Sequence, residues 1–529
     1  MGRLCLCLLV LLLAGRARSQ TAFGDVSFAN SGAAAAQEPF LRGLALLHDF
    51  EYADAAVSFR KAEAIDPGFA MAWWGETMTF NHPVWMQQDA AAARAALQKL
   101  GATREERLTK AGTERERGYL RAVELLYGSG TKEQRDFHYA DAMAALHQRY
   151  PDDVDATAFY ALSLLGTAHQ GRDFATYMKS AALLEEVFPT HQHHPGVLHY
   201  LIHSYDDPIH APLGLRAARL YGEVASSAPH ALHMTSHIFI ALGKWDDVIA
   251  ANQKAKDALK AHHAAMPGMA HGPECGHGIT WMTYAFLQEH RFEEAAKQIE
   301  ACRFSAAGEQ FNGRIPPLDY DDSKVTSLAE MRLLQSIDTG KWDSGDPFVI
   351  PPGPYATAAF TLAYGEALAA ARGDDLNALH ASAARLHEKE KDLLTMIESA
   401  KQDDPRERYR QRAEIEVLQI DALERLRAGK TDEGLAMLRK AAAQESAMAL
   451  AFGPPEVEKP SFELLGEELL ALGRNAEANT AFESALARAP GRTRLLEGLL
   501  RTEQALGDAE GTDRTSKQLR RYVRQPSVR

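Results

Sequence analysis

Small and hydrophobic residues of this chain follow a pattern that returns at the same intervals in two distant segments. Residues 36–69 carry Gly43, Leu46, Ala55, Phe59, Ala62 and Pro67, and residues 459–492 carry Gly466, Leu469, Ala478, Phe482, Ala485 and Pro490. The successive offsets are 3, 9, 4, 3 and 5 in both segments. A glycine lets two helices approach closely, an Ala-x3-Phe spacing marks the packing face of a second helix, and the proline ends that helix. Sustained alternation of apolar and polar residues is nearly absent, so the pattern predicts an all-α protein built from helical hairpins.

Both segments resemble the tetratricopeptide repeat family, whose unit is a helical hairpin of about 34 residues. Further copies end in short turn motifs, such as LGKW at 242–245 and TGKW at 339–342, so the resemblance covers most of the chain. It implies a helical-hairpin solenoid, wound as a right-handed superhelix, with a concave groove that is the usual binding surface in this family.

Gly/Pro-rich or acidic stretches that are too long for ordinary repeat turns interrupt the array. They cover residues 263–276, 303–324, 343–355 and 451–459. The middle two predict a boundary between two lobes. We therefore expect an N-terminal lobe with a histidine-rich groove over 20–302, an irregular connection with one helical segment over 303–355, and a C-terminal lobe over 356–529.

Residues 1–19 are typical of a secretory signal peptide. Arg3 supplies the basic start, residues 4–14 form a short apolar core, and residues 17–19 (Ala-Arg-Ser) place small side chains before a cleavage site. The apolar core is too short to span a bilayer comfortably, and no later stretch is long and apolar enough to do so. We expect an exported protein of bacterial type, periplasmic or secreted, with no transmembrane segment after cleavage.

Charge and motifs exclude several classes of function. The chain of 529 residues has a formal net charge of −13, which argues against nucleic acid as a partner because phosphate binding needs a basic face. The His-Glu-x-x-His, Walker, G-x-S-x-G and G-x-G-x-x-G motifs of familiar enzymes are missing. Glu463 and Glu467 hold groove positions of their repeat, and we expect them on a solvated acidic face; the alternative is that they face the histidines across the groove of the superhelix.

Two cysteines lie beyond the signal peptide. Cys275 immediately precedes the first helix of its repeat, and Cys302 lies late in the second helix. Antiparallel packing brings these two ends together, and an exported compartment permits disulfides. The positions favour a Cys275–Cys302 disulfide over two unpaired cysteines.

Histidines are concentrated in one part of the chain, because 14 of the 21 lie between residues 191 and 290. His199 and His203 are followed 34 residues later by His233 and His237. In the family that the chain resembles, these repeat positions face the concave groove. With two further histidines at another groove position, the expected metal ligands are His199, His203, His233, His237, His230 and His277.

The spacing of these histidines suits a transition metal. Residues i and i+4 on a helix are neighbours, so each His-x3-His pair can chelate an ion, and adjacent helices about 8–10 Å apart allow two pairs to share one ion or bracket two. A set rich in imidazole and poor in carboxylate favours copper or zinc, admits iron, and disfavours calcium and magnesium.

The reaction at such a site depends on its other residues. A zinc hydrolase needs a carboxylate base near the metal-bound water, which Asp206, Asp207 or Glu274 can supply. Because the two aspartates precede Pro208, ending a helix is as well supported for them as accepting a hydrogen bond from an imidazole N–H. A copper pair would favour oxidative chemistry with Tyr284 nearby. The leading hypothesis is a metal-dependent oxidoreductase or hydrolase acting on a small molecule or peptide in the groove. The alternatives are a scaffold that binds a peptide or protein partner in the cell envelope, and a metal carrier without catalysis.

Overall fold

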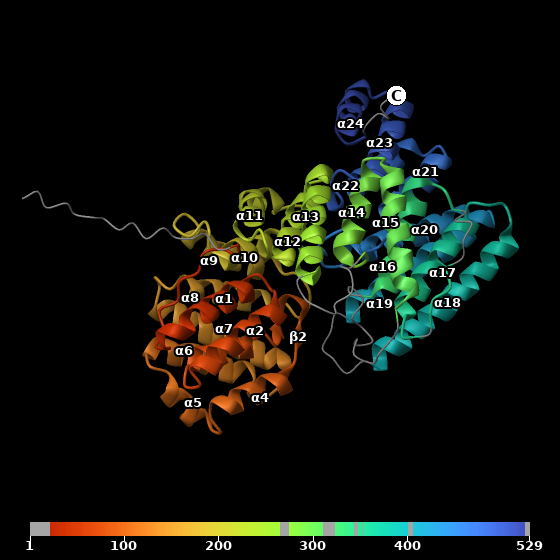
Figure 1. The fold of residues 1–529 in the computed structure, drawn as a ribbon. Coiled ribbons are helices and arrows are strands. Elements are labelled where there is room, and N and C mark those ends of the chain that lie inside the picture. The colour runs from red at the N-terminus through yellow and green to blue at the C-terminus, as the bar shows by residue number, and fades with distance from the viewer. Residues whose placement is uncertain are drawn as a thin grey trace, which may run out of the picture.

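The computed structural model describes residues 22–264, 274–309, 323–342, 348–351, 353–399 and 406–523, and the predicted signal peptide lies outside them. Within these ranges, 24 α-helices follow one another, and the single sheet is a two-residue hairpin, β1 (Asn81–His82) with β2 (Gln87–Gln88) (Figure 1). The predicted all-α architecture of paired helices is therefore confirmed.

The first thirteen helices pack largely against their neighbours in the chain. In several of them, an Asp or Thr side chain just before the first residue accepts a hydrogen bond from a backbone N–H of the first turn. They are α1 (Gln37–His48), α2 (Tyr52–Ile65), α3 (Ala70–Met78), α4 (Ala90–Leu100), α5 (Arg104–Lys110), α6 (Glu114–Leu126), α7 (Lys132–Arg149), α8 (Val154–Leu165), α9 (Phe174–Val187), α10 (Pro195–Tyr205), α11 (Ala211–Val224), α12 (Pro229–Ala241) and α13 (Trp245–Ala264). Short 3-10 turns η1 (Ala34–Ala36) and η2 (Pro83–Trp85) complete this part.

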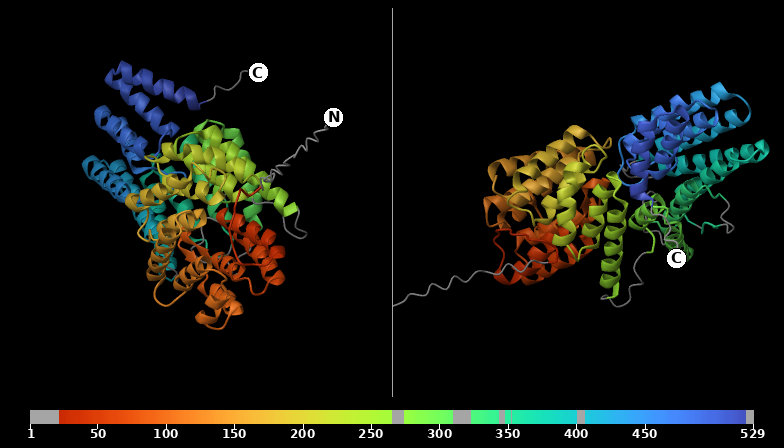
Figure 2. Two further views of the ribbon diagram at one scale, coloured as in Figure 1. Left: turned by 90° about the vertical axis from the view of Figure 1, so that its left-hand side faces the viewer. Right: turned by 90° about the horizontal axis from the view of Figure 1, so that it is seen from above.

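The second part continues in the same manner. It contains α14 (His277–Gln288), α15 (Phe292–Ala307), α16 (Lys324–Thr339), α17 (Ala356–Ala370), α18 (Leu376–Ser399), α19 (Arg406–Arg427), α20 (Thr431–Ala447), α21 (Ser461–Ala471), α22 (Asn475–Arg488), α23 (Thr493–Leu506) and α24 (Ala509–Tyr522). Figures 1 and 2 show α12–α16 between the N-terminal helices and the C-terminal helices.

The repeat pattern read from the sequence corresponds to one packing contact in both copies. A Cβ placed on Gly43 would lie 2.9 Å from the ring of Phe59, and a Cβ on Gly466 would lie 2.8 Å from the ring of Phe482. Both phenylalanines are fully buried between the helices of their hairpin. Glycine is therefore required where each helix crosses its partner, as the spacing predicts.

Buried hydrophobic side chains form two large clusters. One extends from Phe28 through α16 to Ala358, and the other extends from Leu333 to Leu499. The two clusters meet at α16 and α17, where the sequence places the connection between lobes. The two parts of the array therefore join through buried helices.

The C-terminal helices fold back onto the middle of the chain. The indole N–H of Trp245 donates to the carbonyl of Gly491 (3.3 Å), and the backbone N–H of Thr493 donates to Oε1 of Gln288 (2.9 Å). A Cβ on Gly243 would lie 2.9 Å from the carbonyl oxygen of Pro490. Residues 489–493, between α22 and α23, are thus fixed against the α12–α13 turn and α14.

A buried ion cluster lies beside this contact and corrects the expectation for Glu463. The Glu463 side chain is fully buried and pairs with Arg492 (2.5 Å) and Lys459 (2.7 Å), and Asp338 also pairs with Arg492 (3.0 Å). These cations compensate a carboxylate that would otherwise be costly to bury. Glu467 is only partly exposed and pairs with Lys459 and Arg494 (2.7 Å each), so the expected solvated acidic face is absent at both positions.

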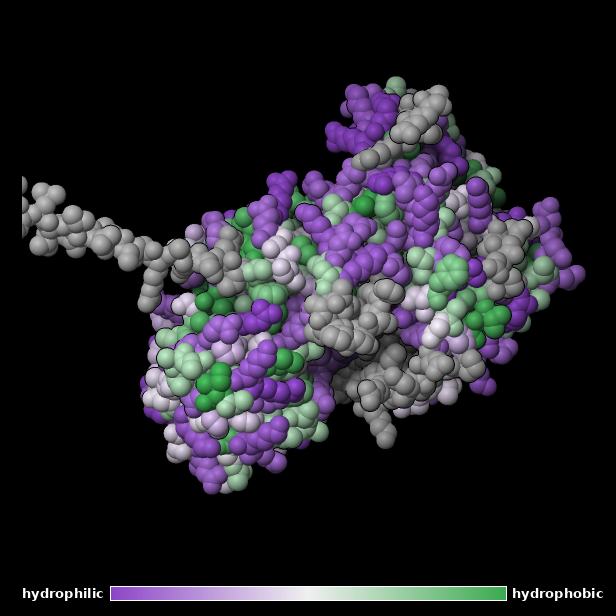
Figure 3. Space-filling view, viewed as in Figure 1, coloured by the Kyte–Doolittle hydropathy of each residue, from purple (hydrophilic) through white to green (hydrophobic). Residues whose placement is uncertain are grey.

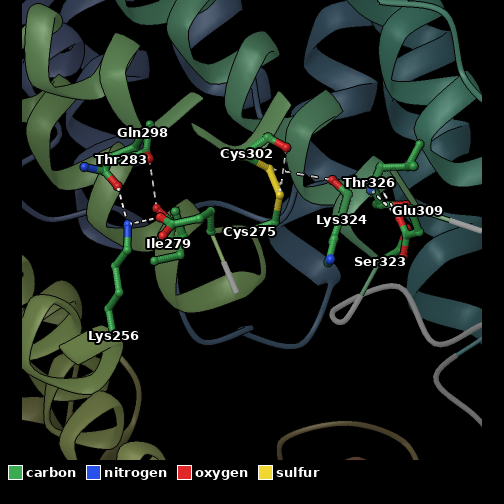
Figure 4. The surroundings of a disulfide bond; sticks show 12 residues. Lys256, Cys275, Ile279, Thr283, Gln298, Cys302, Glu309, Ser323, Lys324 and Thr326 are labelled. Carbon is green, nitrogen blue, oxygen red and sulfur yellow. Dashed lines mark hydrogen bonds and ion pairs between the residues drawn. A yellow bond between two sulfur atoms is a disulfide. The ribbon is translucent and has the colours of Figure 1, made fainter. Parts of the chain in front are cut away.

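A disulfide joins Cys275 and Cys302, with their Cα atoms 4.9 Å apart, as the sequence predicts. Figure 4 shows that it links the segment before α14 to α15, close to Lys324 at the start of α16. It therefore fixes the entry of α14, which carries His277.

Hydrophilic side chains dominate the face of the molecule drawn in Figure 3, with apolar residues in small scattered groups. Among the described helices, none has the length and apolarity needed to cross a membrane.

Candidate metal centre

Helix α10 carries the first histidine pair. Pro195 occupies its first turn and His194 caps it, with Nδ1 accepting from the backbone N–H of Val197 (3.3 Å). The helix is apolar on all sides and every residue in it is buried, including His199 and His203 one turn apart. The two imidazoles therefore lie inside the protein.

Three imidazoles converge on one point. One ring nitrogen from each of His199, His203 and His230 lies within 4.8 Å of the others. The Nε2 atom of each ring is buried and has no hydrogen-bond partner in the structure. A buried polar atom without a hydrogen-bond partner lowers the stability of the folded protein. Three such nitrogens close together can each donate a lone pair to one metal ion.

A backbone contact fixes the orientation of the first ring. Nδ1–H of His199 donates to the carbonyl of His48 (2.6 Å), which leaves Nε2 as the nitrogen that carries the lone pair. The ring of Phe50 packs against all three imidazoles, at 4.3 Å from His199, 5.8 Å from His203 and 5.6 Å from His230. The site is thus enclosed by aromatic side chains.

Burial also sets the protonation of these rings. Loss of solvation, reinforced by neighbouring histidines, lowers the pKa values of His199, His203 and His230 well below the ordinary range. All three are neutral at pH 7, which is the form that binds metal.

Helix α12 adds the second pair, directly beside the first. The ring of His237 lies 5.8 Å from that of His203, and the ring of His233 lies 6.3 Å from that of His230. Nδ1 of His233 contacts Oδ1 of Asn252 (2.6 Å), and Nδ1 of His237 contacts Oδ2 of Asp206 (2.5 Å). Their Nε2 atoms lie 3.3 Å apart.

His277, the sixth expected ligand, opens α14 and lies next to this pair. Its ring is 4.5 Å from that of His233 and 6.0 Å from that of Trp281. The structure thus brings all six expected histidines into one continuous group across α10, α12 and α14.

The four candidate catalytic residues have different surroundings. Asp206 follows the last residue of α10 and contacts His237, whereas Asp207 accepts from the backbone N–H of His210 (3.0 Å) and pairs with Arg172 (3.4 Å). Asp206, Asp207 and Tyr284 line a neighbouring hollow of about 70 Å³. Glu274 pairs instead with Lys256 and Lys260, and the Tyr284 hydroxyl accepts from Arg492 (3.3 Å).

A small pocket of about 110 Å³ opens onto the histidine group. Its polar wall combines histidines of α10, α12 and α14 with Arg408 and Arg412 of α19, and aromatic side chains complete it. The lining includes His203, His230, His237, His277, Trp85, Trp281, Phe452, Arg408, Arg412, Glu330, Glu456 and Glu458.

The histidines do not face an open groove, in contrast to the expectation. His199 is 0% exposed and His203 is 2% exposed. The segment 451–459 and helix α19 cover them from the second part of the array, and the ring of Phe452 lies 5.2 Å from that of His237. Gly453 follows with a φ of 95°, and a Cβ on it would lie 2.5 Å from the Trp281 ring, so this covering segment needs glycine there.

A second group of buried titratable residues was not found from the sequence. His48 contacts Asp155 (3.0 Å) through Nε2 and the Tyr200 hydroxyl (2.9 Å) through Nδ1, and Nε2 of His194 also contacts Asp155 (3.3 Å). Burial lowers the pKa of His48 to about 4, so it is neutral and donates to the carboxylate.

In this second group the Nε2 hydrogen bonds of His48 and His194 both go to Oδ1 of Asp155, while Oδ2 is buried without a partner. Nδ1 of His194 accepts from Val197, so its Nε2 carries the proton that points at Asp155. Both imidazoles direct N–H groups at the carboxylate, and the lone pairs needed by an ion face elsewhere. The group instead holds α1, α8 and α10 together, and through the His48 carbonyl it supports His199.

No protein-family model matches the sequence, and no curated protein matches it. Solved structures similar to the chain include the human IFIT1 dimer with m7Gppp-AAAA (11% identity, 94% of this chain and 91% of that one, TM-score 0.33) and yeast Tom70 (11%, 92% and 99%, 0.32). A third is the P58(IPK) TPR domain (12%, 90% and 99%, TM-score 0.20).

The class that the fold defines is a helical-hairpin repeat protein, as its own succession of packed helices shows. Within that class, its distinguishing feature is a buried histidine group at the junction of its two parts.

Proposed function

We propose that the protein is an exported metal-dependent enzyme that holds a transition-metal ion on His199, His203 and His230. The observation that supports this proposal is the convergence of one ring nitrogen from each of three histidines, whose buried Nε2 atoms have no hydrogen-bond partner. Without an ion, these atoms leave an uncompensated cost of about 1–3 kcal/mol each, which a bound ion removes.

The donor set favours copper or zinc, with iron as a further candidate. Three neutral imidazoles and no carboxylate match the ligands of catalytic zinc and of copper, and three protein ligands leave a coordination position open for water or substrate. Bound zinc would supply an activated water for hydrolysis, and bound copper would supply redox chemistry.

The pocket beside the ligands favours a small substrate over an extended peptide. Its volume is about 110 Å³, and the covering segment with Phe452 closes it from one side. Trp85, Trp281 and Phe452 give it apolar walls, and its other side carries ion pairs of Arg408 and Arg412 with the carboxylates Glu330, Glu456 and Glu458. We therefore propose an oxidoreductase or hydrolase acting on a small, partly apolar molecule, working in the periplasm or outside the cell.

Metal analysis of the purified protein tests this proposal. The protein is isolated without added metal and without chelator, and its metal content is measured by mass spectrometry for the wild type and His199→Leu. The matched control is His193→Ala, whose side chain is 54% exposed in the same part of the chain.

We expect bound copper, zinc or iron in the wild type and the control, and a loss of metal in His199→Leu. Less than one-tenth of an equivalent in the wild type, unchanged after incubation with each ion, would refute the metal centre. A peptide that still binds after complete chelation would favour the scaffold alternative.

A further inference from the structure

The second histidine pair has fixed tautomers, and Asn252 fixes the first of them. The amide nitrogen of Asn252 donates to the carbonyl of Val248 (3.0 Å), so its Oδ1 is the atom that faces His233. An amide oxygen only accepts, so Nδ1 of His233 must be the donor at 2.6 Å. In the neutral ring, Nε2 of His233 therefore carries a lone pair.

Asp206 fixes the second tautomer. Its Oδ2 lies 2.5 Å from Nδ1 of His237, and a carboxylate in this position accepts the ring proton. Nε2 of the neutral His237 ring therefore also carries a lone pair. An imidazole N–H directed at a carboxylate is also the usual arrangement behind a metal-bound histidine.

These two lone pairs face each other, because the Nε2 atoms of His233 and His237 are 3.3 Å apart. Two neutral acceptors at hydrogen-bond distance repel each other unless a cation lies between them. That cation is either a proton, which makes one ring an imidazolium, or a metal ion. Two nitrogen ligands of a tetrahedral ion, each about 2.0–2.1 Å from the metal, lie about 3.3–3.4 Å apart.

We propose that His233 and His237 bind a second metal ion, separate from the ion on His199, His203 and His230, so that the histidine group is a two-ion centre. This inference rests on the proposed function for the first ion and adds the second position. Both Nδ1 atoms are already engaged by fixed acceptors, so both Nε2 atoms are available together on one side of α12.

The surroundings leave room for further ligands. His237 and His277 both line the 110 Å³ pocket that also reaches His203 and His230. A ligand in that pocket therefore has access to both ion positions. A small molecule with two adjacent oxygen donors, such as a carboxylate, a diol or dioxygen, is the chemical class that can contact two ions at once.

Stoichiometric titration of the chelated, full-length protein tests the second position. Zinc alone is added to the protein, and bound metal is counted by calorimetry and by mass spectrometry after desalting. The variants are His199→Leu for the first ion and His237→Leu for the second, with His193→Ala as control. Circular dichroism and melting temperature establish that each variant is folded.

We expect two equivalents of zinc in the wild type and the control, and one equivalent in each of the two leucine variants. Asp206→Asn, which keeps the size of the side chain, should keep two sites and weaken one of them by about 10–100-fold. This variant tests the proposal even if His237→Leu does not fold.

Three results would overturn the inference in distinguishable ways. If the wild type binds one equivalent of zinc and His237→Leu binds it with the same affinity, a proton lies between His233 and His237, and only the ion on His199, His203 and His230 is supported. If the wild type binds one equivalent that is lost in His237→Leu and kept in His199→Leu, the proposed ion on His199 is wrong. No bound zinc, copper or iron in the wild type refutes both ions.

Discussion

The substitution His203→Leu should have opposite effects on the stability of the metal-free and metal-loaded protein. His203 is 2% exposed, and its Nε2 atom is buried without a partner. Leucine has a similar volume and no polar atom, so it removes an unsatisfied nitrogen that costs about 1–3 kcal/mol in the metal-free state. The variant should therefore be more stable than the wild type after chelation, by about 1 kcal/mol once imperfect packing is allowed for.

In the metal-loaded state, His203→Leu should instead be less stable than the wild type. An ion at 100 times its dissociation constant stabilises the wild type by about 2.7 kcal/mol, and the variant loses most of this contribution. In a cooperative unit of 150–250 residues, each kcal/mol shifts the melting temperature by about 2–4 °C. Differential scanning calorimetry with chelator and with metal measures both shifts, and His193→Ala provides the unshifted control.

If His203→Leu lowers the melting temperature by the same amount with chelator and with metal, the imidazole is a packing residue with a satisfied environment. The three convergent nitrogens would then not be a metal site.

Further predictions concern the elements around the site. Cys302→Ser should lower the free energy of unfolding of the metal-free protein by about 3.5 kcal/mol, because the disulfide closes a loop with a sequence separation of 27 and so reduces the entropy of the unfolded chain. In a thermal melt, the wild type under reducing agent should have the same melting temperature as this variant. Glu463→Ala removes the carboxylate shared by the buried cations of Arg492 and Lys459, leaving Arg492 only Asp338 and Lys459 only Glu467 as partners, and should cost about 3–5 kcal/mol. The loss is measured by thermal unfolding against the exposed-site control Glu477→Ala; equal melting temperatures would contradict the buried cluster. Gly453→Ala places a methyl group against Trp281 at a φ of 95°, so the covering segment 451–459 should shift. A chelator should then remove the metal at least several-fold faster than from the wild type. An unchanged rate of metal loss would mean that this segment does not limit access of the chelator to the site.

Local packing was predictable from the sequence because it depends on spacing along single helices. The Gly43–Phe59 and Gly466–Phe482 contacts follow from one interval in the chain, and so does the closeness of His199 to His203. The Cys275–Cys302 disulfide is of the same kind, since one hairpin brings both residues together.

The surroundings of the site were not predictable in this way, because they come from residues far apart in the chain. Asp155 approaches His48 across 107 positions, and Phe452 covers His237 from beyond the predicted lobe boundary. Glu463 was expected in solvent because the nearby Lys459 is equally compatible with an exposed ion pair, and only Arg492, 29 residues later, shows that the side chain is enclosed. Such contacts depend on how separate hairpins pack against one another, which no local period encodes.

The contact of residues 489–493 with the α12–α13 turn and α14 changes how this array should unfold. In an open array each hairpin touches only its neighbours, so terminal repeats fray independently and stability is a sum of local terms. Here Trp245 and Gly491 are bonded across 246 positions, and Gln288 and Thr493 across 205. The intervening helices form a closed ring of contacts, so opening at α14 also frees α23. Amide protons in these two helices should therefore exchange with one common opening free energy, as a single cooperative unit.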